Sequence, residues 1–173
     1  MPSVGPSNST GKGPYRMQSA NWAPASAVAV GDLVFKSASD HYDYSALLFT
    51  WNTNLATTQE DFHDTFRGVS QVRRTTAQLT AGTQVTDGCI AATGEFCFPC
   101  AALESAVYVA NNQYVAIAQG TGNTLNPQKV VPTTTIALAI GKVTRDAPVG
   151  QTFLWFEIVP ALGPASNGLN TMA

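Results

Sequence analysis

The later half of the chain is built from short apolar segments, each closed by a glycine, proline or asparagine. The segments are rich in aromatic and β-branched residues, and turn residues separate them at short intervals. This punctuation predicts strands joined by tight turns, because a helix needs a longer uninterrupted segment with a 3.6-residue period. We therefore expect an all-β domain. The predicted strands are 89–93, 95–98, 106–109, 135–140 and 152–159.

The first half adds further strands and one helix. Apolar runs predict strands over 28–35, 47–51 and 68–72, the first entered through a Gly31-Asp32 turn. Between the second and third of these runs the apolar period changes from two to about 3.6, which indicates a helix.

The helix is predicted over 57–65. Thr57 and Glu60 have the spacing of a capping box, and Phe62 and Phe66 are four residues apart. We expect these two phenylalanines to plug one end of a β-barrel or sandwich.

Two later strands differ in the faces they present. In 136–140 large and small residues alternate, so the large side chains are expected to face the core. The run 152–159 hardly alternates, so both of its faces are apolar. Such a strand is typically central in its sheet and covered twice. A second subunit is one candidate for the second cover.

The chain has 173 residues, of which 45% are apolar, enough for one domain with its own core. We place this domain at 25–160. The segments 1–24 and 161–173 are rich in proline, glycine, serine and asparagine and lack periodicity. We interpret them as an extended N-terminal arm and a C-terminal tail, which either stay disordered or become ordered only against a neighbour.

Charged residues make up only 12% of the chain, against a usual share of roughly 25%. Either a large area is shared with partners, because interface cores are depleted in charge, or the surface is simply threonine-rich β structure. The net charge of -2 gives no basic face for nucleic acid. The local basic cluster of Arg67, Arg73 and Arg74 fits a solvated strand edge or a salt bridge to a partner better than a phosphate site.

No apolar run approaches the ~20 residues of a membrane span. The N-terminus lacks a charged start followed by an apolar stretch, so it does not resemble a secretory signal, and we expect a protein made and used without export. Three cysteines are too few, and odd in number, for a disulfide framework.

Cys97 and Cys100 form a C-x-x-C pair, but they follow a strand-like segment rather than opening a helix, where a thiol would become reactive. A zinc site needs two further ligands, and Cys89 is the only other thiol. We predict that the cysteines are structural and reduced.

Each histidine has acidic neighbours that could form half of an acid–base or metal site, yet no nucleophile elbow, phosphate loop, zinc-protease motif or calcium loop accompanies them. We predict no catalytic, cofactor-binding or metal site, and a protein that is not an enzyme. The groups are His41 with Asp40 and Asp43, and His63 with Asp61 and Asp64.

The three tryptophans divide into two kinds. Trp155 lies inside an apolar run and is expected in the core. Trp22 in the arm and Trp51 at a strand end are expected to anchor a partner, because tryptophan is frequent at interface hot spots. The alternative is that they stack on sugar in a carbohydrate-binding module.

Six short motifs follow one another along residues 28–160. They are Val30-Gly31-Asp32-Leu33-Val34, Phe66-Arg67-Gly68-Val69-Ser70, Ala92-Thr93-Gly94-Glu95-Phe96-Cys97-Phe98-Pro99, Ala106-Val107-Tyr108-Val109, Ile140-Gly141-Lys142-Val143 and Phe153-Leu154-Trp155-Phe156-Glu157-Ile158. Their order resembles that of the small β-domain capsid decoration, or cement, proteins of tailed bacteriophages. The helix insertion and the long terminal segments depart from the shortest members of those families.

The resemblance implies a β-barrel or β-tulip fold with a short helix, and a place on the exterior of the virion after synthesis in the host cytoplasm. It implies binding to the outside of a capsid, commonly as a homotrimer, where the protein clamps neighbouring major capsid subunits. It carries over no catalytic residue and no cofactor, and it implies neither nucleic acid nor membrane as partner. The main alternative is a β-sandwich binding module of a phage tail or head fibre, which could bind carbohydrate.

Overall fold

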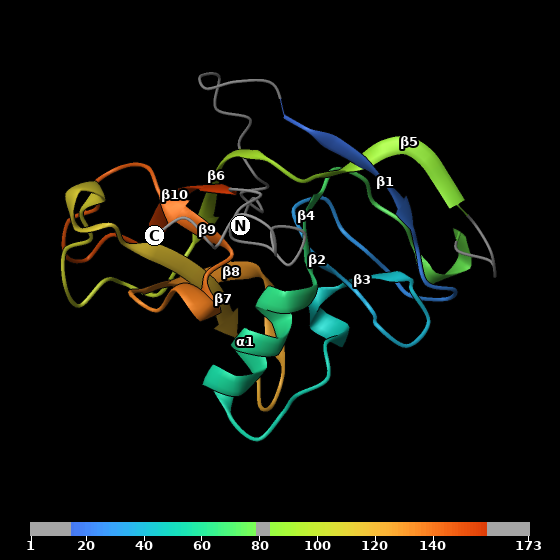
Figure 1. The fold of residues 1–173 in the computed structure, drawn as a ribbon, viewed down its shortest axis with the longest axis horizontal. Helices are drawn as coiled ribbons and strands as arrows, with labels where there is room; N and C mark the ends of the chain where they lie inside the picture. The colour runs from blue at the N-terminus through green and yellow to red at the C-terminus, as the bar shows by residue number, and fades with distance from the viewer. Residues whose placement is uncertain (1–14, 79–83, 159–173) are drawn as a thin grey trace, which may run out of the picture.

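Two five-stranded antiparallel sheets lie side by side in the computed structural model, which describes residues 15–78 and 84–158 (Figure 1). The sheets have the strand orders β1-β5-β4-β2-β3 and β6-β10-β9-β7-β8. The prediction of an all-β domain with one short α-helix is confirmed. The strands are β1 Met17–Asn21, β2 Leu33–Lys36, β3 Asp43–Ser45, β4 Phe66–Ser70, β5 Gln84–Ala91, β6 Gly94–Pro99, β7 Tyr114–Gln119, β8 Leu125–Thr133, β9 Gly141–Val143 and β10 Phe153–Ile158.

One α-helix and four short 3-10 helices connect these strands within the described residues. They are η1 Ala46–Leu48, α1 Leu55–Thr65, η2 Thr76–Gln78, η3 Val109–Asn111 and η4 Ile136–Leu138. None of the described helices is long and apolar enough to span a lipid bilayer.

Both sheets curl. In the first, the chain beyond β1 returns to the opposite edge, where Trp22 forms a bridge with Asp43 of β3 and the Ala23 N–H donates to the Asp43 carbonyl. In the second, the edge strands β6 and β8 approach one another without pairing, so the sheet forms a half-barrel. Curling of this kind encloses side chains and shortens the exposed sheet edges.

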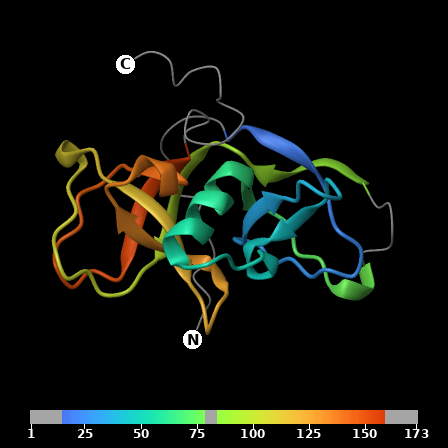
Figure 2. The same ribbon diagram turned by 60° about the horizontal axis from the view of Figure 1, so that its bottom comes forward.

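A single hydrophobic cluster joins the two sheets. Leu33 and Phe35 of the first sheet belong to the same buried cluster as Phe96, Val115 and Phe156 of the second. Helix α1 lies between the sheets (Figure 2), and its buried Phe62 is part of this cluster. The two halves therefore share one core.

The helix prediction is confirmed, with two differences at its start. α1 begins two residues earlier than expected, and its N-cap is Asn54, whose side chain accepts a hydrogen bond from the Thr57 N–H. The expected capping box at Thr57 is therefore wrong, because asparagine already satisfies the first-turn donor. Phe62 and Phe66 are both buried and their rings are 5.7 Å apart, although Phe66 belongs to β4.

Three expected strands are wrong. Segment 136–140 contains η4, and Ile136 is exposed; the Ile140 N–H donates to the Val115 carbonyl, so the chain joins the sheet only where β9 begins. Segment 47–51 overlaps η1, and segment 106–109 forms only an isolated bridge at Val107 before η3. In each case a local 3-10 turn replaced the extended backbone that the apolar residues suggested.

Part of the predicted N-terminal arm belongs to the folded body. β1 pairs with β5. Trp22, the residue directly after β1, is 1% exposed and belongs to a buried cluster with Val34 and Ile90. Trp22 is buried because β1 pairs with a strand that is distant in the sequence, and the local sequence pattern does not reveal that pairing. Residues 1–14 and the predicted tail 161–173 lie outside the described residues.

Strand β10 is central, as expected, because it pairs with both β6 and β9. Its burial nevertheless alternates: Leu154, Phe156 and Ile158 face the core, whereas Phe153 is 44% exposed and Trp155 is half-buried. The described residues thus cover one of its two apolar faces and leave the other open.

Candidate interaction face

The outward side of β10 and its two neighbours carries an unusual set of side chains. Phe153 and Trp155 lie on this side, opposite Pro99 and Cys97 of β6 in the strand register. We call this surface the Trp155 face and define it by these four residues together with Glu95, Arg145, Glu157 and Lys142, which lie on the same side.

An ion pair fixes the centre of the Trp155 face. The Arg145 guanidinium donates from Nη2 to Glu95 Oε2 at 2.8 Å and from Nε to Glu95 Oε1 at 3.3 Å. The guanidinium carbon Cζ of Arg145 lies 3.8 Å from the centre of the Trp155 ring. Glu95 is almost fully buried, and the bond to it raises the pKa of Arg145. The forked hydrogen bond and the stacking hold one orientation, so the face is organised before any partner binds.

A second group supports this ion pair. The Thr144 hydroxyl donates to Glu95 Oε1 at 2.7 Å, so this carboxylate oxygen accepts bonds from two residues.

Trp155 was expected in the core. That expectation is wrong, because its ring lies on the outer side of the sheet, stacked with the Arg145 guanidinium. The sequence signal that could have found the site is an acidic residue inside the apolar strand at Glu95, since buried carboxylates need a partner.

The C-x-x-C cysteines lie at the border of this face and have protonated thiols at neutral pH. Burial raises the pKa of Cys97 to about 11, and burial also raises the pKa of Cys100. The Cys100 thiol contacts the Gln151 carbonyl oxygen at 3.8 Å. No disulfide joins Cys89, Cys97 and Cys100. A raised pKa disfavours nucleophilic or metal-binding thiolates, and the described residues contain no cluster of three His, Cys, Asp or Glu that could hold a metal.

The two histidines and their aspartates do not form a common site. His41 is exposed in a turn with φ of 61°, beside Asp40, which accepts hydrogen bonds from the Tyr44 hydroxyl and the Tyr42 N–H. The bond from Tyr44 lowers the pKa of Asp40 and raises that of Tyr44 to about 12. These groups stabilise a turn rather than line a cleft.

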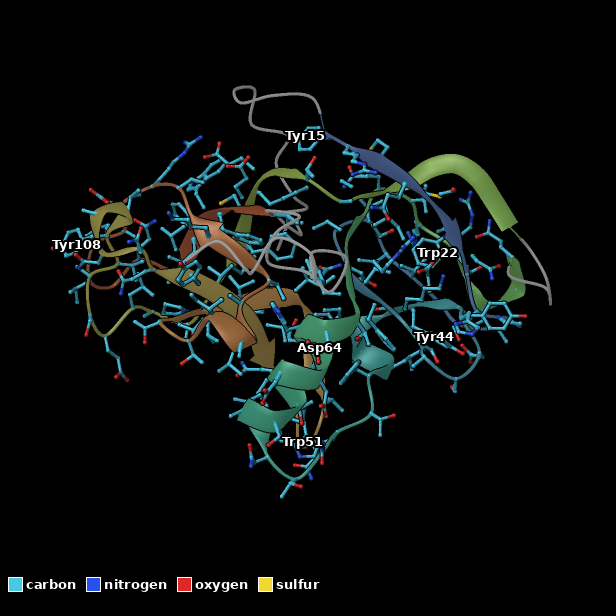
Figure 3. The ribbon with its side chains drawn as sticks, viewed as in Figure 1. Tyr15, Trp22, Tyr44, Trp51, Asp64 and Tyr108 are labelled. Atoms are coloured by element: carbon cyan, nitrogen blue, oxygen red, sulfur yellow. The ribbon has the colours of Figure 1, made fainter. Side chains whose placement is uncertain are left out.

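The second histidine is also used structurally. His63 donates from Nδ1 to the Ala139 carbonyl, which ties α1 to the segment after η4. Asp61 accepts from the Asn52 side chain, and Asp64 is exposed on the helix (Figure 3).

The arginine cluster does not form a phosphate site. Arg67 pairs with the buried Asp43 at 3.4 Å, while Arg74 pairs its backbone with Val28. Burial raises the pKa of Asp43, opposed by hydrogen bonding from the Asn21 N–H and by Arg67. Arg67 therefore forms its salt bridge within the chain, whereas the salt bridge expected from the sequence was one to a partner.

Neither of the tryptophans expected to anchor a partner is freely exposed. Trp22 is buried inside the first sheet, so the expectation that it contacts a partner is wrong. Trp51 is half-buried beside α1 and packs against the main core (Figure 3).

A second exposed region lies beyond the ends of β6 and β10. The segments 99–111 and 145–153 run side by side there, joined by a bridge between Val107 and Ala147 and by the Val109 N–H bonded to Asp146 at 2.8 Å. We call this region the loop tip; Tyr108 marks its end (Figure 3). Tyr108, Val109 and Val149 are all at least 37% exposed.

A hollow of about 570 Å³ lies beneath the loop tip. Residues 101–107, Gln113 and 131–134 line it, and the Gln113 side chain accepts from the Tyr108 N–H at 2.6 Å. Sequence reasoning missed this site; its signal is the set of small residues Ala101, Ala102, Ser105 and Ala106 close together in the chain.

No family model matches the chain, and neither the curated proteins nor the solved structures contain a match. The geometry of the two exposed regions therefore carries the functional argument.

Proposed function

We propose that this chain is a structural virion protein that binds the outer surface of an assembled phage capsid. It stabilises the shell by clamping neighbouring major capsid subunits. It acts on the exterior of the virion as a non-catalytic binding module, without cofactor or metal.

The observation that carries this proposal is the side of β10 that residues 15–78 and 84–158 leave open. Phe153 is 44% exposed, and Trp155 is held in place by Arg145 and Glu95. Aromatic residues and arginine are the residue types that dominate interface energetics, and preorganisation lowers the entropic cost of binding. The low charge of the chain and the motif order given above support the same function.

The Trp155 face is suited to self-association. Its four charged residues are two acids, Glu95 and Glu157, and two bases, Arg145 and Lys142, with Glu157 opposite Lys142 in the strand register. A face without net charge can meet a copy of itself without like-charge repulsion. We propose a homotrimer assembled through this face.

The fibre-module alternative requires aromatic rings free to stack on sugar. Trp22 is buried and Trp51 packs against the core, which leaves neither ring open in the way that such a site needs. The rings of Tyr108 and Phe153 are exposed, so the motif order, rather than the aromatic residues, is the reason that we favour the capsid function.

Self-association is tested by sedimentation of purified variants. Phe153→Ser and Trp155→Ala are expected to shift the trimer towards monomer. Val30→Ser is the matched control, because Val30 is as exposed as Phe153 but lies in the turn before β2, outside the Trp155 face, and it should remain trimeric. A wild-type protein that is strictly monomeric would contradict the trimer.

Binding to capsid is tested by cosedimentation with empty, expanded shells of the major capsid protein from the phage that encodes this chain. The account predicts saturable binding at a fixed ratio to coat subunits. Protein that stays in the supernatant at all concentrations would contradict the function.

A further inference from the structure

The loop tip differs from the Trp155 face in charge. Within 99–111 and 145–153 the charged side chains are Glu104, Arg145 and Asp146, all exposed. Arg145 pairs with Glu95 of the Trp155 face, so Glu104 and Asp146 set the charge that the loop tip presents to a partner. Two such tips would repel each other, so this surface suits a different partner from the one that the Trp155 face suits.

The hollow under the tip has the shape of a groove for extended chain. Small side chains at Ala101, Ala102, Ser105 and Ala106 leave the space open. Its other wall is the end of β8, which is an edge strand of its sheet. An edge strand beside an open groove is the usual place where an extended segment adds to a sheet.

The lining also indicates what kind of segment fits. Among the described residues, Glu104 is the one charged residue that lines the hollow, and Asp146 accepts a hydrogen bond from the adjacent Val109 N–H. Besides alanines, the apolar side chains of the lining are Leu103, Val107, Val131 and Pro132. Apolar contacts next to isolated carboxylates are complementary to an extended chain that carries a lysine or arginine.

We propose that the hollow and loop tip bind an extended segment of the major capsid protein, with a Lys or Arg side chain placed against Glu104. This rests on the proposed capsid function and adds to it a second surface. The hollow is lined by none of the residues of the Trp155 face, and the loop tip adjoins that face at Pro99, Arg145 and Phe153. A protein with one surface for its own copies and another for the shell can hold neighbouring subunits together.

The experiment measures binding of the full-length protein to the empty, expanded shells described above. Ala102→Trp fills the hollow and is expected to weaken binding on the order of tenfold or more, as expected for loss of a central contact. Glu104→Lys should weaken it several-fold, more so at low salt. The matched controls are Ala77→Trp and Glu60→Lys, exposed positions in η2 and α1, which should bind like the wild type.

The outcomes separate the two proposals. Normal shell binding by both hollow variants, with the wild type also bound, overturns the docking site and leaves the capsid function standing. A wild type that does not bind shells overturns both. Loss of self-association in Ala102→Trp, with the monomer still binding shells, would assign the hollow to a second copy and also overturn the proposal. Melting curves for all four variants should match the wild type, which separates lost docking from lost folding.

Discussion

The ring of Tyr15 lies directly on the backbone of Gly94. A Cβ at Gly94 would sit 2.1 Å from Tyr15 Cδ1, and Gly94 has φ of 128°, a conformation that other residues rarely adopt. Tyr15 also packs on Phe96, with 5.5 Å between ring centres. Gly94 also pairs with Ile158, so Tyr15 and the last residue of β10 meet at the start of β6.

We predict that Gly94→Ala lowers the free energy of unfolding by about 2 kcal/mol or more, since the change adds backbone strain and displaces Tyr15. Chemical denaturation measures the loss. Gly122→Ala is the control: Gly122 also has positive φ, but nothing lies within 4 Å of its Cβ position. Equal losses at the two glycines would show that the contact with Tyr15 contributes nothing.

Removal of residues 1–24 should strongly destabilise the protein. The deletion takes away β1 and the buried Trp22, and loss of a buried tryptophan alone costs about 3–5 kcal/mol. A shorter deletion of residues 1–14 leaves Tyr15, β1 and Trp22 in place and should melt close to the wild type. The melting temperatures of the two deletions decide the point, and similar values would contradict it.

Arg145→Ala should lower the melting temperature by several degrees, because it leaves the buried carboxylate of Glu95 without its forked partner. It should also change the fluorescence of Trp155, on which the guanidinium stacks. Arg73→Ala, at an exposed position, is the control and should change neither. If Arg145→Lys behaves like the wild type, charge alone is sufficient and the forked geometry is not required.

Much of the core was predictable from the sequence, and the parts that were not depend on distant partners. The i, i+4 spacing of Phe62 and Phe66 identified the helix and its buried side. Burial of Trp22 depends on the pairing of β1 with β5, and the contact between Glu95 and Arg145 joins residues 50 positions apart. Local periodicity carries no information about such contacts. The strand predicted over 136–140 is wrong because only the end of this segment, at Ile140, enters the sheet.

The thiol of Cys97 should react slowly with alkylating reagents near neutral pH, and its rate should rise towards an apparent pKa of about 11. The folded protein retains this proton at a pH where the unfolded chain, with a thiol pKa near 9.0, has lost it. Stability linked to Cys97 is therefore full below pH 9 and falls as the pH rises towards 11. Cys97→Ser should remove this part of the pH dependence. Rapid alkylation at pH 7 would contradict the assignment.

The central claim is that this protein stabilises a viral shell. It is tested most directly by the temperature at which expanded shells rupture, with and without saturating amounts of the protein. Many weakly bound copies that prefer the assembled lattice should raise this temperature by mass action, in proportion to occupancy. A rupture temperature that stays unchanged at full occupancy would contradict the account.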